Sequence, residues 1–164
     1  MSRTTVCATA LVMACIWSPP CLASQPDTAS MKRMYKKMKA AMGKKEEAAF
    51  KAQWHPRAYA TNLVGGSGLP GKSVYRQGTR KGWYLKPQMA KLRGLPMRRG
   101  GPWIVPTLIW SDKKGKAVDM VYVLIVYKKK WMILGGGERL AEVEALGKRW
   151  VDKKPLAPPK KKSK

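Results

Sequence analysis

Residues 117–127 read AVDMVYVLIVY, and this run predicts the central strand of the fold. β-Branched and aromatic residues fill the run, and apolar side chains alternate on both of its faces. A strand with two apolar faces is stable only when both faces are covered. We therefore expect helices against one face and a partner subunit, in a homodimer, against the other.

Shorter predicted strands flank this central one. Residues 102–110 are rich in β-branched and aromatic side chains, and the charged segment 111–116 predicts a hairpin loop after them. Residues 128–130 predict a turn, residues 131–134 a last short strand, and the glycines at 135–137 its end. Together these segments predict an antiparallel meander.

Helical periodicity dominates the residues before the meander. In the segment 31–42, apolar residues recur at steps of three and four, and the opposite face carries Lys32, Arg33, Lys36 and Lys37. We expect the apolar stripe to pack against the domain itself; the alternative is a membrane surface or a partner's groove. A second helix is predicted at 46–54, a glycine-rich connection at 64–82, a weak helix at 85–92 and a closing helix at 138–151.

Helices followed by a meander indicate an α+β domain, with N-terminal helices packed on a curved antiparallel sheet and a C-terminal helix. The run KKMKAAMGKKEEAAFKAQWHP (36–56) resembles the helical opening of the NTF2-like (SnoaL-like) α+β barrel superfamily. The run KAVDMVYVLIVYKKKWMILGGGE (116–138) is similar to the strand-turn-strand ending of the same superfamily. The resemblance implies a cone-shaped pocket between helices and sheet and dimerisation through the outer face of the sheet. The superfamily contains both enzymes and non-catalytic binding domains, so it leaves the activity open.

Residues 1–23, MSRTTVCATALVMACIWSPPCLA, have the pattern of a signal peptide. We expect cleavage between Ala23 and Ser24 and export to the periplasm or beyond; the alternative is a lipoprotein anchored at Cys15. All three cysteines of the chain lie within this segment, so the mature chain would contain no thiol. A short linker (24–30), one domain (31–152) and a basic disordered tail (153–164) are predicted to follow.

The formal net charge of the chain is +25. Such an excess attracts polyanions and is weakened by salt. The candidate basic surface consists of the lysines and arginine of the first helix together with the tail residues Lys160, Lys161 and Lys162. Solvated helix faces with a disordered tail are the favoured interpretation; the alternative is contact with anionic envelope polymers, lipid head groups or nucleic acid outside the cell.

Residues 66–73, GSGLPGKS, match the phosphate-binding pattern G-x-x-x-x-G-K-[ST]. The residues after the motif, 74–78, predict a poor helix interrupted by glycine, and no series of βαβ units accompanies it. We therefore expect no bound nucleotide.

His55 is the only histidine, which excludes a multi-histidine metal site, and neither a metal nor another cofactor is expected. His55 and Asp119 are the candidate acid-base residues of a pocket enzyme of the isomerase or dehydratase type. A cap or surface role for His55 is the favoured interpretation. Four aromatic residues near the glycine-rich segment are candidates for a ligand pocket: Trp54, Tyr59, Trp83 and Tyr84.

These observations together predict an exported, non-enzymatic protein of the bacterial envelope that binds a small apolar ligand or acts as an accessory factor. Two alternatives stay open. One is the pocket enzyme, and the other is a polyanion-binding protein without a ligand cavity.

Overall fold

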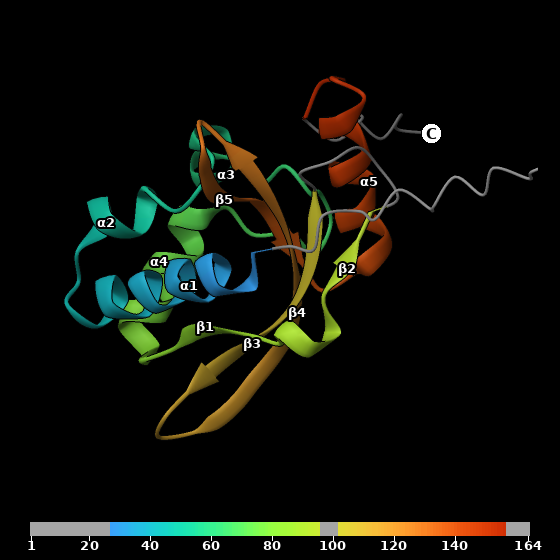
Figure 1. The fold of residues 1–164 in the computed structure, drawn as a ribbon. Helices are drawn as coiled ribbons and strands as arrows, with labels where there is room; N and C mark the ends of the chain where they lie inside the picture. The colour runs from blue at the N-terminus through green and yellow to red at the C-terminus, as the bar shows by residue number, and fades with distance from the viewer. Residues whose placement is uncertain (1–26, 96–101, 157–164) are drawn as a thin grey trace, which may run out of the picture.

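The computed structural model describes residues 27–95 and 102–156 (Figure 1). The predicted signal peptide with its cut between Ala23 and Ser24, the lipidation alternative at Cys15, and the tail lysines 160–162 lie outside these ranges.

The described chain forms an α+β fold, as the sequence predicts. The helices are α1 (Thr28–Gly43), α2 (Glu47–Lys51), α3 (Pro56–Ala60), α4 (Gly71–Lys81), the 3-10 helix η1 (Met89–Lys91) and α5 (Leu140–Val151). The strands are β1 (Tyr84–Pro87), β2 (Arg93–Gly94), β3 (Trp103–Ser111), β4 (Gly115–Tyr127) and β5 (Lys130–Gly137). They form one antiparallel sheet in the order β1-β3-β4-β5, with β2 beside β3. The sheet curls into a half-barrel, with α1 and α4 on one side of it and α5 on the other (Figure 1).

β4 is the central strand, and its middle, residues 122–125, is buried on both faces. Tyr122 lies opposite Val105 of β3 and Gly136 of β5, and the ring of Tyr122 is directed toward the N-terminal helices. The next residue, Val123, faces the other way and is fully buried. In this region α5 of the same chain covers the second face, with Leu146 lying over Gly135. That helix therefore occupies part of the face for which the sequence predicts a partner subunit.

α1 packs its methionine-rich stripe into the core, as expected from its periodicity. Its buried residues are Met31, Met34, Tyr35, Met38, Ala41 and Met42. The side chain of Asp27 caps the helix by accepting a hydrogen bond from the backbone N–H of Ser30 at 2.9 Å. The Tyr35 and Thr107 hydroxyls, 3.3 Å apart, join α1 to β3.

The predictions for residues 64–92 are wrong in two places. The segment predicted as a glycine-rich connection contains the eleven-residue helix α4, and the segment predicted as a weak helix begins with strand β1. Glycine lowers helix propensity, but here Gly71 packs against the rings of Trp54 and Tyr59, and Gly78 lies against Met42 and the backbone of Trp83. Tertiary packing therefore overrides propensity.

The prediction that glycines end the last strand is also wrong, because β5 continues through Gly137. Each of the three glycines lies where another group approaches the strand closely. Leu146 lies over Gly135, the ring of Tyr122 over Gly136, and Ser67 beside Gly137. The second predicted helix is likewise shorter than expected: α2 ends at Lys51, and Trp54 instead forms a bridge with Ile133 of β5.

Gly136→Ala is expected to lower the free energy of unfolding by about 1–3 kcal/mol, because the added methyl group would overlap the packed ring of Tyr122. Gly43→Ala is the matched control. It makes the same chemical change at the last residue of α1, where no atom lies within 4 Å of the new methyl group. We expect it to be neutral or to stabilise the protein by up to about 1 kcal/mol. Urea unfolding followed by circular dichroism measures both, and equal effects would contradict the prediction.

Candidate functional site

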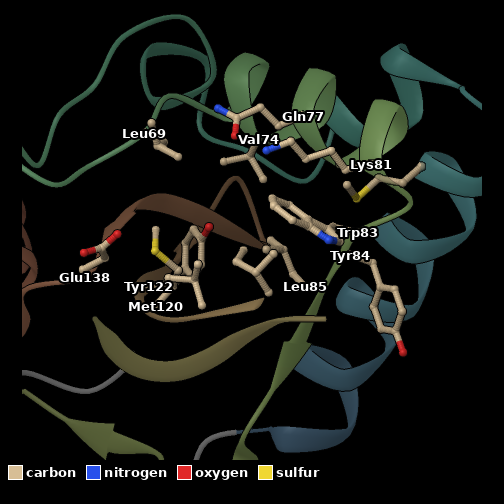
Figure 2. A pocket seen from close by; sticks show the side chains of 14 residues that line it. Leu69, Val74, Gln77, Lys81, Trp83, Tyr84, Leu85, Met120, Tyr122 and Glu138 are labelled. Carbon is tan, nitrogen blue, oxygen red and sulfur yellow. The ribbon is translucent and has the colours of Figure 1, made fainter. Parts of the chain in front are cut away.

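A cleft of about 270 Å³ lies between α4 and the sheet (Figure 2). α4 and the loop before it form one wall, and the strands β1, β3 and β4 form the other. Most of the lining side chains are apolar: Met42, Leu69, Val74, Leu85, Ile109, Val118 and Met120. Gln77, Lys81 and Glu138 are the polar side chains on the α4 side and at the far end of the cleft.

Tyr122 supplies a polar group to this apolar cleft. Its side chain is fully buried, and no described group lies within hydrogen-bonding distance of its hydroxyl. Figure 2 shows the hydroxyl pointing into the space between the sheet and α4. Burial raises the pKa of Tyr122 far above its usual range, so the phenol stays neutral. A buried hydroxyl without a partner costs about 1–3 kcal/mol, so a ligand that offers a polar atom here would recover free energy.

Trp83 and Tyr84, two of the four predicted pocket aromatics, border the cleft at the end away from Glu138 (Figure 2). The Lys81 ammonium lies 4.3 Å from the centre of the Trp83 ring. The Tyr84 hydroxyl donates a 2.6 Å hydrogen bond to Asp112, and Lys39 contacts the same carboxylate at 3.0 Å. These two hydrogen bonds hold the pKa of Asp112 below its usual value.

The other two predicted pocket aromatics lie elsewhere. Trp54 is 1% exposed and packs against Phe50 and, edge-on at 5.9 Å, against Tyr122. The Tyr59 hydroxyl donates a 2.6 Å hydrogen bond to Glu47 of α2. Neither of them is among the residues that line the cleft.

A second hollow of about 280 Å³ adjoins the cleft. Lys39 and Lys45, from α1 and the turn after it, lie in its wall together with Asp112. Both hollows are lined by Met42, Gly78, Trp83 and Tyr84. The aromatic pair therefore stands between an apolar compartment and a charged one.

The structure does not bring His55 and Asp119 together. The ring of His55 packs against Tyr127 at 4.9 Å and Trp150 at 5.5 Å, whereas Asp119 is exposed and paired with Lys116. Asp119 and Tyr127 are eight residue steps apart along β4, which at about 3.3 Å per step is about 26 Å of strand. Acid-base partners need hydrogen-bond reach or one intervening water, so this geometry provides no such pair.

Three residues of the GSGLPGKS motif, Ser67, Gly68 and Leu69, donate hydrogen bonds within the chain. The N–H and hydroxyl of Ser67 donate to the carboxylate of Glu142 at 3.3 and 3.2 Å. The N–H of Gly68 donates to Gly65, and that of Leu69 donates to Gly136 of β5. The regular helix α4 begins within the motif at Gly71 and continues to Lys81, which corrects the expectation of a poor helix. In this fold the loop joins α4 to α5 and β5.

Sequence reasoning missed Tyr122 and the wall formed by α4. A signal for the floor of the cleft was present, since Val118, Met120 and Tyr122 alternate on one face of the predicted central strand. A tyrosine inside an otherwise aliphatic face marks a polar atom that needs a partner. The α4 wall gave a weaker signal, because its glycines hide the helical pattern.

Among the described residues, no three histidine, cysteine, aspartate or glutamate side chains come together as a metal site would require. Of the helices that the structure describes, none is both long and apolar enough to cross a bilayer. No protein-family model, curated protein or solved structure matches the chain. The NTF2-like assignment therefore stays a prediction.

The buried position of His55 leads us to expect a loss of stability at mildly acidic pH. Burial, with a smaller effect from the charge of Arg57, lowers the pKa of His55 below its usual value, so the folded state disfavours the protonated ring. The unfolded chain takes up the proton at about pH 6.5. The contribution of His55 to the free energy of unfolding is therefore constant above that pH. It falls as the pH drops from there toward the lower pKa of the folded state.

Urea unfolding midpoints measured between about pH 7.5 and 5 should show this loss. The chain has one histidine, so His55→Gln is expected to flatten the profile in this window. The carboxylates with lowered pKa values, Asp27 and Asp112, act at more acidic pH because they start from 3.8. Parallel profiles for the parent and the variant would contradict the assignment.

Proposed function

We propose that this chain is an exported, non-enzymatic protein of the bacterial envelope that binds a small, mainly apolar ligand in the cleft beneath α4. The observation that carries the proposal is the buried hydroxyl of Tyr122, which has no described partner and points into an apolar cleft. Ligand pockets in proteins typically combine apolar walls with a few polar groups that fix orientation. The cleft has this composition.

The walls supply affinity and the hydroxyl supplies orientation. Each square ångström of apolar ligand surface that leaves water contributes about 25 cal/mol. A ligand that also pairs with Tyr122 adds a hydrogen bond worth about 0.5–1.5 kcal/mol and removes an unsatisfied buried group. A purely aliphatic ligand of the same size would leave that hydroxyl without a partner.

The curled sheet with α1 and α4 on one side supports membership in the NTF2-like superfamily as part of the same proposal. The cleft lies between helices and sheet, which is where that resemblance implies a pocket. Export rests on the composition of residues 1–23.

The exposed face of α1 supports a second element of the proposal, contact with anionic envelope polymers or lipid head groups. Lys32, Arg33, Lys36 and Lys37 are all exposed. Among the described residues, none of these four has a carboxylate within salt-bridge distance. Their charge is therefore available to an outside partner, and the contact should weaken with salt.

Tyr122→Phe tests the central claim. The substitution removes only the hydroxyl, so the free energy of unfolding should be unchanged or higher, because an unpaired buried polar group is lost. Decanol, whose hydroxyl can pair with Tyr122, should bind the variant about three- to tenfold more weakly. Quenching of tryptophan fluorescence measures the affinity, and unchanged decanol binding would refute the role of the hydroxyl.

A pair of valine substitutions on β4 tests the place of binding. Val118→Phe fills the cleft and should abolish or strongly weaken decanol binding. Val126→Phe makes the same change on the same strand at an exposed position and should leave binding unchanged. Equal effects of the two substitutions would place decanol outside the cleft.

The polyanion-binding alternative makes a separate prediction for α1. Lys36→Glu/Lys37→Glu should elute from heparin at lower salt than Lys113→Glu/Lys114→Glu, which carries the same charge change on the exposed β3–β4 hairpin. If the two double variants elute together, retention reflects net charge alone. Strong α1-dependent retention combined with no decanol binding would replace the ligand proposal with the polyanion-binding one.

A further inference from the structure

We infer that the ligand carries two polar groups at opposite ends of an apolar body: a neutral hydroxyl or carbonyl at Tyr122, and a carboxylate or similar anion near Lys45. An ω-hydroxy carboxylic acid has this chemistry. The inference rests on the proposed function, since it concerns the ligand of the same cleft. Three features of the described residues carry it.

The first feature is that the two hollows lie next to each other. The apolar cleft of about 270 Å³ and the charged hollow of about 280 Å³ share four lining residues, among them Trp83 and Tyr84. A ligand that extends from the cleft past the aromatic pair would reach the charged hollow. Trp83 offers it an aromatic surface on the way.

The second feature is the distribution of charge along this path. Glu138 lies at the end of the cleft away from Trp83, as Figure 2 shows. Lys39 and Lys45 lie in the hollow beyond Trp83. Lys39 is paired with Asp112 at 3.0 Å, whereas Lys45 has no carboxylate within salt-bridge distance among the described residues. An anionic group is therefore repelled at the Glu138 end and attracted at the other end, first by Lys81 beside Trp83 and then by Lys45.

The third feature is the character of the polar point inside the cleft. The hydroxyl of Tyr122 is neutral and buried among apolar side chains. A charged ligand group at this depth would lose its hydration without a counter-charge, which costs much more than one hydrogen bond returns. The ligand group that pairs with Tyr122 is therefore neutral.

Three ligands of the same chain length test the inference: decanol, decanoate and ω-hydroxydecanoate. Binding is measured by tryptophan fluorescence to the parent, to Tyr122→Phe and to Lys45→Gln. ω-Hydroxydecanoate should bind more tightly than either other ligand. Tyr122→Phe should weaken ω-hydroxydecanoate and decanol about three- to tenfold and leave decanoate unchanged. Lys45→Gln should weaken ω-hydroxydecanoate and decanoate about two- to fivefold, as expected for an exposed ion pair, and leave decanol unchanged.

Lys37→Gln is the matched control, because it removes the same charge from the exposed face of α1 outside both hollows. It should leave all three affinities unchanged. If Lys37→Gln and Lys45→Gln weaken decanoate equally, or if ω-hydroxydecanoate gains nothing over the better single-headed ligand, the inference is overturned. Decanol binding that still depends on Tyr122 would then preserve the proposed function, whereas failure of all three ligands to bind would overturn both.

Discussion

The close approach of Tyr122 to Gly136 is the contact on which the rest of the structure depends. The two residues lie opposite each other in the β4–β5 pair, and the ring of Tyr122 occupies the space that a side chain at position 136 would fill. From there the ring meets Trp54, and Trp54 packs on Phe50 and Gly71. One glycine in β5 thus allows a single aromatic contact to join the sheet to α2 and α4. The same placement leaves the phenolic hydroxyl at the floor of the cleft.

The parts of the fold that could be predicted are those in which a long segment follows one period. The alternation in β4 and the three- and four-residue steps in α1 and α5 identify these elements, because each buries a regular stripe. α4 and β1 could not be predicted in this way. Gly71 and Gly78 are unfavourable for an isolated helix and become necessary only when Trp54 and Met42 pack against them. A local pattern contains no information about such partners.

The candidate site likewise has parts that local sequence patterns predict and parts that depend on tertiary packing. Trp83 and Tyr84 border the cleft, as predicted from their position next to the glycine-rich segment. Tyr122 lies on a correctly predicted strand. The cleft itself required α4, so its floor could be read from the sequence but its opposite wall could not. The separation of His55 from Asp119 also depends on tertiary structure, because only the path of β4 sets the distance between them. In the GSGLPGKS segment, a carboxylate from α5 accepts hydrogen bonds from the N–H and hydroxyl of Ser67, a contact that only the tertiary structure reveals.

The twelve-residue helix α5 has a consequence beyond covering the sheet. Near its start Glu142 holds Ser67, two residues before the cleft-lining Leu69, and near its end Trp150 packs on the ring of His55. A helix of this length is a rod of about 18 Å. The one histidine of the chain and the loop that leads into one wall of the cleft therefore both pack against α5. Protonation of His55 and binding of a ligand beside Leu69 would therefore act at opposite ends of one helix.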